Sequence, residues 1–542
     1  MIRQGAAVLR DQVRRVMHLG KFFCLSVILI VTACSESTPG GLVAAAGPLE
    51  ETTANAQTRQ APGSSWFVDM DATDPGDGKT WSSAWATFRE IRWGYGGVQP
   101  GDTIFISGGS SSKSYAEQLV VGASGRPGSE ITIRVGQETG HNGTVVISNP
   151  SGVGIVIRDR AYVTIDGSVN NMQRLRISGC ASHGVHVLKN SHHIKLTYLE
   201  VDNNGNKAEH HGIYMNHTNS DHSPAVEVSY SLIHDNWQDQ IKGEGERGPK
   251  QYGRFLIHHN RIYNLTDDGI EHDMHGLDFF YNHVSKLRVG KGRGHPDGLQ
   301  ILAGYARIYN NVFADLSNPQ CNDSVNAYIF VDIYSDTEME QCCVRVFNNL
   351  VYQTQDPVPR QYWRGLSLAA EGKITALTDV LIANNTFVGL PAWGSMMFFR
   401  TQKSHKIRDI VYVNNIIDNC FRLTGGEALS LSPGEYTVGS WGDKAGVTID
   451  YNVISAGPAG KTTIAFKSGW YRYADWERAT GCQRSIAGNP APLLDGAYRL
   501  NAKSPARGTG INLSDQFTMD LAGKVRPKTQ NWDIGAYHHG TD

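Results

Sequence analysis

The chain has 542 residues, of which 40% are apolar and 19% are charged, so it is long enough and apolar enough to bury a core and is not a disordered polypeptide. Its 50 basic and 52 acidic side chains give a formal net charge of −2, which argues against a polyphosphate-binding surface, and we expect no nucleic-acid partner. Eight cysteines in this length exclude a disulfide-dense scaffold.

Residues 1–33 predict an export signal. Basic side chains precede an apolar run, 22–33, that is too short to span a bilayer. The run ends in Val31-Thr32-Ala33-Cys34, which resembles a bacterial lipobox and implies that Cys34 is lipidated. We therefore expect an exported lipoprotein of the cell surface or periplasm, held at the outer membrane in a Gram-negative cell and touching the membrane only through its anchor. An ordinary cleaved signal is the alternative, and the start at Met1 or Met17 stays open.

Residues 34–65 are rich in Ser, Thr, Gly, Ala and Pro without apolar periodicity, which predicts a flexible tether. A single domain over 66–542 follows. Within it, 82–93 places Trp85, Phe88 and Arg92 three and four residues apart, which predicts a short capping helix. Residues 102–106 and 131–133 predict the first strands.

A five-residue phrase then recurs every 28 or 29 residues. It begins at His183, His211, Asp239, Asp268 and Asp297. Its period holds short β-rich runs and almost no helical periodicity, which excludes helical repeats and predicts stacked coils of parallel strands. In such a solenoid the aliphatic residues of each coil are buried against the neighbouring coils.

A second recurring phrase ends in asparagine. Its copies end at Asn260, Asn282, Asn311, Asn349, Asn385, Asn415 and Asn452. Because an amide both donates and accepts, stacked copies can bond one another and the backbone, so we interpret this column as structural. The repeats fade after the last copy, and about 453–542 is predicted to close the domain.

Segments 101–104 and 129–134 near the start, with 495–500 and 533–537 near the end, resemble secreted bacterial right-handed parallel β-helix proteins. This is the superfamily of pectate lyases, chondroitinase B and alginate lyases. The resemblance implies an all-β, right-handed parallel β-helix for 66–542 and a carbohydrate-active protein. The superfamily also includes hydrolases, epimerases and adhesive fibres, so the resemblance leaves the activity open.

The first phrase places Asp239, Asp268 and Asp297 in one column, with neighbours about 5 Å apart. Carboxylates this close need a bound cation such as Ca²⁺, a cationic side chain or a shared proton. The alternative is turn scaffolding, in which each Asp-Gly carboxylate accepts backbone N–H bonds.

Alternation along the strands predicts which side chains face outward. With Ile241, Ile270 and Leu299 pointing into the coil, Lys242, Glu271 and Gln300 point out, beside Tyr214 and His186. A long β-helix face lined by such side chains suits an extended acidic polysaccharide, and we expect a monomer that acts on one.

Cleavage of a uronate polymer by β-elimination needs a cation at the C5 carboxylate, a base for the C5 proton and a donor to the leaving oxygen. The sequence supplies side chains of these types, and the roles that we assign to them resemble those in the calcium-dependent lyases of the superfamily. The predicted Ca²⁺ ligands are Asp239, Asp268, Glu271 and Asp297, the base is Lys242, the groups that steady the carboxylate or leaving group are Arg288, Arg293 and His295, and the substrate contacts are His211, Tyr214 and Gln300.

Three other functions compete with the lyase. A glycoside hydrolase needs two carboxyl groups, and Asp267-Asp268 with His275-Gly276 resembles the paired aspartates and His-Gly of polygalacturonase-like enzymes. A uronate epimerase would use the same proton abstraction, with His295 and Asp297 as a pair. A non-catalytic glycan-binding or adhesive surface protein is the third alternative.

Two further expectations concern histidines and cysteines. The adjacent pairs His192-His193, His210-His211 and His258-His259 are predicted to point apart, and so not to share a metal. A disulfide is predicted between Cys321 and either Cys342 or Cys343, which bracket one inserted loop.

Overall fold

The structure is a computed structural model, and the described residues belong to one compact unit, 55–542. They are 63–73, 76–217, 222–288, 296–316, 327–354, 364–390, 395–399, 406–420, 427–431, 437–439, 446–455, 463–466, 469–472, 478, 484–488 and 493–539. The predicted signal peptide, Cys34, nearly all of the tether, Arg293, His295 and Cys321 lie outside them.

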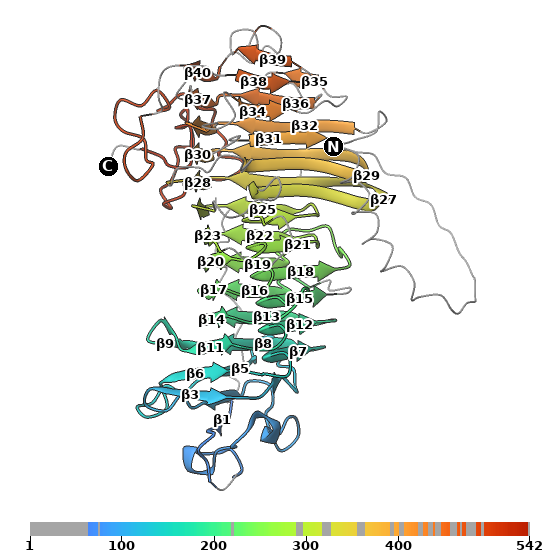
Figure 1. Cartoon of the computed structure of the whole chain (residues 1–542), viewed down its shortest axis with the longest axis vertical. Helices are drawn as coiled ribbons and strands as arrows, with labels where there is room; N and C mark the ends of the chain where they lie inside the picture. The colour runs from blue at the N-terminus through green and yellow to red at the C-terminus, as the bar shows by residue number, and fades with distance from the viewer. Residues whose placement is uncertain are drawn as a thin grey trace, which may run out of the picture. The chain divides into compact units, whose positions relative to one another are not determined.

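The chain winds through three strand-lined faces in every coil, and equivalent strands of successive coils pair in parallel (Figure 1). We name them faces A, B and C. Face A holds β4 (Leu119–Val120), β7 (Ile155–Arg158), β12 (Val185–Leu188), β15 (Ile213–His217), β18 (Ile241–Gly245), β21 (Ile270–His272), β24 (Gln300–Ile301), β31 (Ser395–Phe399), β34 (Glu427–Leu431) and β38 (Thr463–Phe466).

Face B follows face A along the chain. It holds β1 (Ser65–Val68), β2 (Thr103–Ile106), β5 (Ile131–Val135), β8 (Ala161–Asp166), β13 (His192–Thr197), β16 (Val226–Ser229), β19 (Phe255–His258), β22 (Leu277–Phe280), β25 (Ala306–Tyr309), β32 (Lys406–Val413) and β36 (Gly446–Asp450). The long strands β27 (Ala327–Phe347) and β29 (Arg364–Ala383) run through both faces and join them in one 25-stranded sheet, which β35 (Thr437–Gly439) and β39 (Gly469–Arg472) complete.

Face C is a separate 13-stranded sheet. It holds β3 (Ser112–Tyr115), β6 (Thr144–Ile147), β11 (Leu175–Ser178), β14 (Leu199–Asp202), β17 (Leu232–His234), β20 (Arg261–Leu265), β23 (His283–Leu287), β26 (Val312–Ala314), β28 (Leu350–Tyr352), β30 (Thr386–Val388), β33 (Ile416–Asp418), β37 (Val453–Ser455) and β40 (Ile486–Gly488). A small antiparallel hairpin, β9 (Ser168–Val169) and β10 (Met172–Gln173), stands apart.

Columns of aliphatic side chains fill the interior. On face A, Ile213 pairs in register with Ile241, and Ile241 with Ile270, and all three are fully buried. Each such side chain contributes about 1.5–3 kcal/mol by leaving water. The period of the phrase therefore sets the register between coils, and the predicted all-β parallel β-helix is confirmed.

The asparagine column is also confirmed as structural. It lies at the corner between faces B and C. The backbone N–H and the side-chain Nδ2 of Asn349 both donate to Oδ1 of Asn385, at 3.0 and 2.9 Å. Asn385 donates to Asn415 in the same way, at 2.9 Å in both bonds. All three side chains are fully buried, so every amide in the column depends on its neighbour.

The predicted capping helix over 82–93 is wrong. The chain forms two 3₁₀ turns there, η1 (Trp81–Ser83) and η2 (Phe88–Glu90). Between them Trp85 is extended and bridges Val68, donating its N–H to the carbonyl of Phe67 at 3.0 Å. Trp85 therefore pairs with β1 instead of joining the helix that its spacing predicted. Trp85 and Phe88 are nevertheless buried, as a cap requires.

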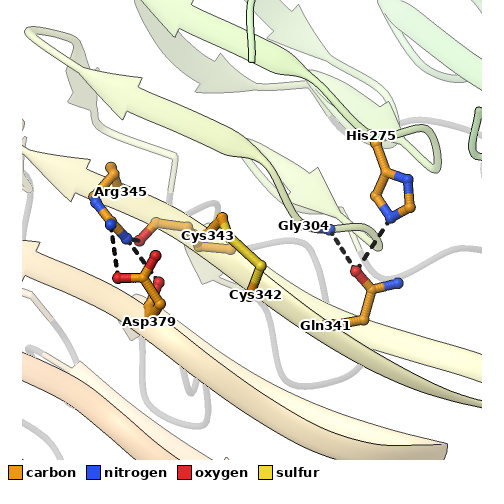
Figure 2. Close-up of a disulfide and its surroundings, with 8 residues drawn as sticks. His275, Gly304, Gln341, Cys342, Cys343, Arg345 and Asp379 are labelled. Carbon is orange, nitrogen blue, oxygen red and sulfur yellow. Dashed lines mark hydrogen bonds and ion pairs between the residues drawn. A yellow bond between two sulfur atoms is a disulfide. The ribbon is translucent and has the colours of Figure 1, made fainter. Parts of the chain in front are cut away.

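The predicted disulfide partner of Cys321 is also wrong, because Cys342 and Cys343 are bonded to each other (Figure 2). Cys343 has φ 71°, a left-handed conformation that interrupts the alternation of β27. The positions of Cys321, Cys342 and Cys343 around the inserted loop do not reveal this left-handed conformation, so they could not predict a bond between adjacent cysteines. Figure 2 shows the bond beside Gln341, whose side-chain oxygen accepts from the backbone N–H of Gly304 at 3.1 Å.

Peptide mapping without reduction is expected to return Cys342 and Cys343 in one peptide that lacks both thiol hydrogens and resists alkylation. Cys180 and Cys420 are free and buried, and they should react with an alkylating reagent only after unfolding. Recovery of a peptide in which Cys321 is cross-linked to Cys342 or Cys343 would contradict the observed pairing.

Residues 493–539 pack along the later coils and are held by corner amides. Nδ2 of Asn348, Asn384 and Asn414 donates to the carbonyls of Met519, Asp533 and Ile511, at 2.6, 2.9 and 2.8 Å. The fully buried guanidinium of Arg526 donates to Oδ1 of Asn348 and to the carbonyl of Gly535. Within the described residues, no helix has the length and apolar character needed to cross a membrane.

Candidate functional site

The predicted column of first residues exists at the entry to face A. The backbone N–H of His211 donates to Nδ1 of His183 at 3.1 Å. Oδ1 of Asp239 accepts the N–H of Asp268 at 3.2 Å, and Oδ1 of Asp268 accepts that of Asp297 at 2.6 Å. One oxygen of each aspartate therefore holds the turn of the next coil, as the scaffolding interpretation expects.

The outward row of face A lies beside this column. Register places Tyr214, Lys242, Glu271 and Gln300 on successive coils. Nζ of Lys242 lies 2.5 Å from Oε1 of Glu271. Asp239, Asp268 and Glu271 each place one oxygen within 4.8 Å of the others, so three of the four predicted acidic ligands are brought together. Asp297, the fourth, is not in this group and donates its backbone N–H to Asp268.

Burial distinguishes this cluster from an open groove. Asp239 is 1% exposed, Asp268 4% and Lys242 7%, whereas the side chain of Glu271 is 22% exposed. Glu271 is therefore the member of the cluster that solvent reaches most easily.

Burial also sets the protonation states. It raises the pKa of Asp239, with the charge of Glu271 adding to the shift, and it raises the pKa of Asp268 well above its usual range, with Asp297 adding. Burial lowers the pKa of His211 to about 4. Burial by itself would lower the pKa of Lys242, but the charges of Glu271 and other nearby carboxyls outweigh burial and raise this pKa.

The donor set fits a hard cation. Oδ2 of Asp239 is buried without a hydrogen-bond partner and lies 3.1 Å from Nδ1 of His211, which burial keeps neutral. Asp268 and Glu271 add carboxylate oxygens within reach, the ligand type that Ca²⁺ takes. Displacing the protons of the buried carboxyls would supply the negative charge that such an ion requires.

Other predicted members lie elsewhere or outside the described residues. Arg288 forms an ion pair with Asp235 at 2.6 Å. These two residues directly follow the face C strands β23 and β17, so Arg288 lies on a different face from the cluster. Arg293 and His295 are among the residues that the structure does not describe. His275 contacts Oε1 of Gln341 and the carbonyl of Gly248, both at 3.2 Å, in the surroundings of the disulfide (Figure 2).

Sequence reasoning missed two acidic residues of this face. Oε2 of Glu244 accepts the hydroxyl of Tyr214 at 2.9 Å, and Oδ2 of Asp332 accepts Nε2 of Gln300 at 3.3 Å. Glu244 stands two residues after Lys242, and Asp332 two residues after Phe330, which pairs with Gln300. The period-2 rule applied further along each strand would have found both.

Two of the three histidine pairs were predicted incorrectly. Nδ1 of His192 lies 2.8 Å from Nδ1 of His193, and the same atoms of His258 and His259 lie 2.9 Å apart. His193 and His259 have φ of 51° and 55°. The left-handed turn at the second residue cancels the alternation of an extended strand, so the two rings converge.

No family model and no curated protein matches the sequence. Among solved structures, the chain is similar to the pectate lyase Pel9A at 13% identity and a TM-score of 0.44, over 89% of this chain and 97% of that one. It is similar to XylC in complex with xylose at 13% identity and a TM-score of 0.47, over 88% and 99%. It is also similar to the GH136 lacto-N-biosidase from Eubacterium ramulus at 13% identity and a TM-score of 0.44, over 72% and 67%.

Proposed function

We propose that this chain is an exported, lipid-anchored enzyme that cleaves an acidic, uronate-containing polysaccharide by β-elimination. The observation that carries the proposal is the cluster on face A, where Asp239, Asp268 and Glu271 converge beside the ammonium of Lys242. It combines a cation-binding set of oxygens with a potential base, on neighbouring coils of one face. The part of the proposal that concerns export and lipidation rests on residues 1–34.

Asp239, Asp268 and Glu271 would hold a calcium ion, with Asp297 supporting Asp268 from the next coil. Bound there, Ca²⁺ would neutralise the C5 carboxylate of a uronate and so acidify the C5 proton. Glu271 is the most exposed of the three ligands, and it marks the side from which a sugar carboxylate would approach.

Lys242 would take the C5 proton. Its amine is held charged by Glu271, so it cannot act as a base in the ion pair that the structure shows. If Glu271 bound a cation instead, its charge would no longer stabilise the ammonium of Lys242. The pKa of Lys242 would then fall, and more of the amine would be neutral. Tyr214 and Gln300, one coil to either side of the pair, would contact neighbouring sugars.

Incubation with a panel of uronate polymers is expected to release products with the ultraviolet absorbance of an unsaturated uronate, and a chelator is expected to abolish the release. The chelator control should be reversed by added Ca²⁺. Binding of the polymers without any product would contradict catalysis and indicate a glycan-binding surface protein.

A glycoside hydrolase is the second candidate. Buried carboxyl groups with raised pKa suit a general acid, and burial raises the pKa of Asp273, near Lys242, to about 7. The contacts of His275 tie it to Gln341 and not to Asp268, so only part of the polygalacturonase-like motif reaches the cluster. New reducing ends without the ultraviolet signal would identify this reaction.

A further inference from the structure

Three imidazoles meet at the entry to face B, away from the carboxylate cluster. His192 and His193 begin β13, and His222 lies shortly before β16 on the next coil. One ring nitrogen of each lies within 4.8 Å of the others. The rings of His192 and His222 are stacked, with centroids 3.6 Å apart and planes 21° from parallel.

The fold itself builds this arrangement. The left-handed backbone of His193 turns its ring toward that of His192. The N–H of His193 donates to the carbonyl of Pro224 at 3.1 Å, and that of Ile194 to Ala225 at 3.1 Å. These bonds fix the register between the two coils, and they bring the segment that carries His222 against the pair.

An aromatic ring of the preceding coil also helps to hold the histidine pair in place. The ring of Tyr162, from the preceding coil, stacks on His193 at 4.3 Å and limits its rotation.

We propose that His192, His193 and His222 form a binding site for a divalent transition-metal ion of the zinc or copper type. Imidazole nitrogens about 2.0–2.1 Å from a tetrahedral zinc ion lie roughly 3.3 Å from one another. The Nδ1 atoms of His192 and His193 lie 2.8 Å apart in a hydrogen bond, so a small separation of the two rings reaches this spacing, and His222, which is exposed, can turn to complete the set. Three histidines leave a fourth position for water or an outside ligand.

The chain offers a matched control. His258 and His259 have the same local conformation, with a φ of 55° at His259, but they lie at the end of β19, two coils further along face B, and not at the start of a strand. Their neighbours are the aromatic rings of Phe280 and Tyr281, at 4.7 and 5.0 Å, where the proposed site has a third histidine. The carboxylate of Glu227 lies 3.4 Å from Nε2 of His258, and not beside the Nδ1 atoms through which the two rings meet. A pair without His222 should bind zinc far more weakly.

Calorimetric titration of the full chain with Zn²⁺, in saturating Ca²⁺ to occupy oxygen-rich sites, is expected to show one tight equivalent. His222→Ala should weaken this binding on the order of 10–100-fold or more, whereas His259→Ala should leave it unchanged. His222→Cys, which restores a zinc ligand, should recover most of the affinity. Unchanged binding in His222→Ala, or an equal loss in His259→Ala, would overturn the proposal.

Two further measurements separate this site from the rest of the molecule. With Cu²⁺ as the probe, electron paramagnetic resonance should show coupling to three nitrogens in the parent chain and to two in His222→Ala. Asp268→Asn should keep the tight zinc equivalent, so failure of the polysaccharide proposal would not remove the metal site. Coupling to an unchanged number of nitrogens in His222→Ala would also overturn the metal-site proposal.

Discussion

Asp268→Asn is expected to lower turnover of an acidic polysaccharide roughly 10²–10⁴-fold while leaving the coils stacked. The Asn oxygen can still accept the N–H of Asp297, so the turn keeps its hydrogen bond. Burial already favours the uncharged carboxyl, and an amide is close to it in shape. What the substitution removes is the ability to become the carboxylate that a cation needs. Turnover on uronate polymers and thermal unfolding measured on the same preparation test both parts.

Lys242→Ala should abolish turnover as well, because it removes the proposed base. The matched control is Lys195→Ala. Nζ of Lys195 lies 2.9 Å from Oε1 of Glu227, so it forms the same type of ion pair between neighbouring coils, but on face B. Full activity in Lys242→Ala would place the base elsewhere, and collapse of the fold in Asp268→Asn would show the aspartate column to be turn scaffolding.

Asn385→Ala is expected to cost about 3–5 kcal/mol of unfolding free energy, the largest stability effect we predict for a single substitution. The change removes the acceptor of two bonds from Asn349 and the donor to both Asn415 and the carbonyl of Val346. All these groups are buried, so each loses a partner without gaining water.

Urea unfolding monitored by circular dichroism measures the loss. Asn531→Ala is the control, because Asn531 is exposed and the substitution should change the unfolding free energy by no more than about 0.5 kcal/mol. Equal midpoints for Asn385→Ala and the parent chain would show that the column is dispensable and that the aliphatic columns alone hold the coils together.

The period of the sequence predicted the coils, the inward aliphatic columns, the asparagine column and the convergence of Asp239, Asp268 and Glu271. These features follow from one rule, that equal intervals bring equal positions together. The rule does not predict how deeply a position is covered, since cover comes from segments outside the period. Asp239 and Asp268, which sequence reasoning set on an open face, are almost fully buried, whereas the side chain of Glu271 is 22% exposed.

The errors share a physical cause in local backbone conformation. The convergence of His192 with His193 and the bond between Cys342 and Cys343 both involve a residue with positive φ. The prediction for the histidine rings rests on extended strands, in which neighbours alternate, and the prediction for the cysteines rests on their positions around an inserted loop. At Trp85 a bridge to β1 similarly overrides a spacing that is typical of a helix.

The attachment of residues 493–539 has a consequence for the order in which the chain folds. Asn348, Asn384 and Asn414 precede their partners by 171, 149 and 97 residues. Coils near the amino terminus can stack as translation delivers them, since each needs only its neighbours. The coils that carry these three amides remain incompletely bonded until the final segment arrives. A nascent or truncated chain would therefore expose that flank to proteases, and resistance would appear only with the last stretch of polypeptide.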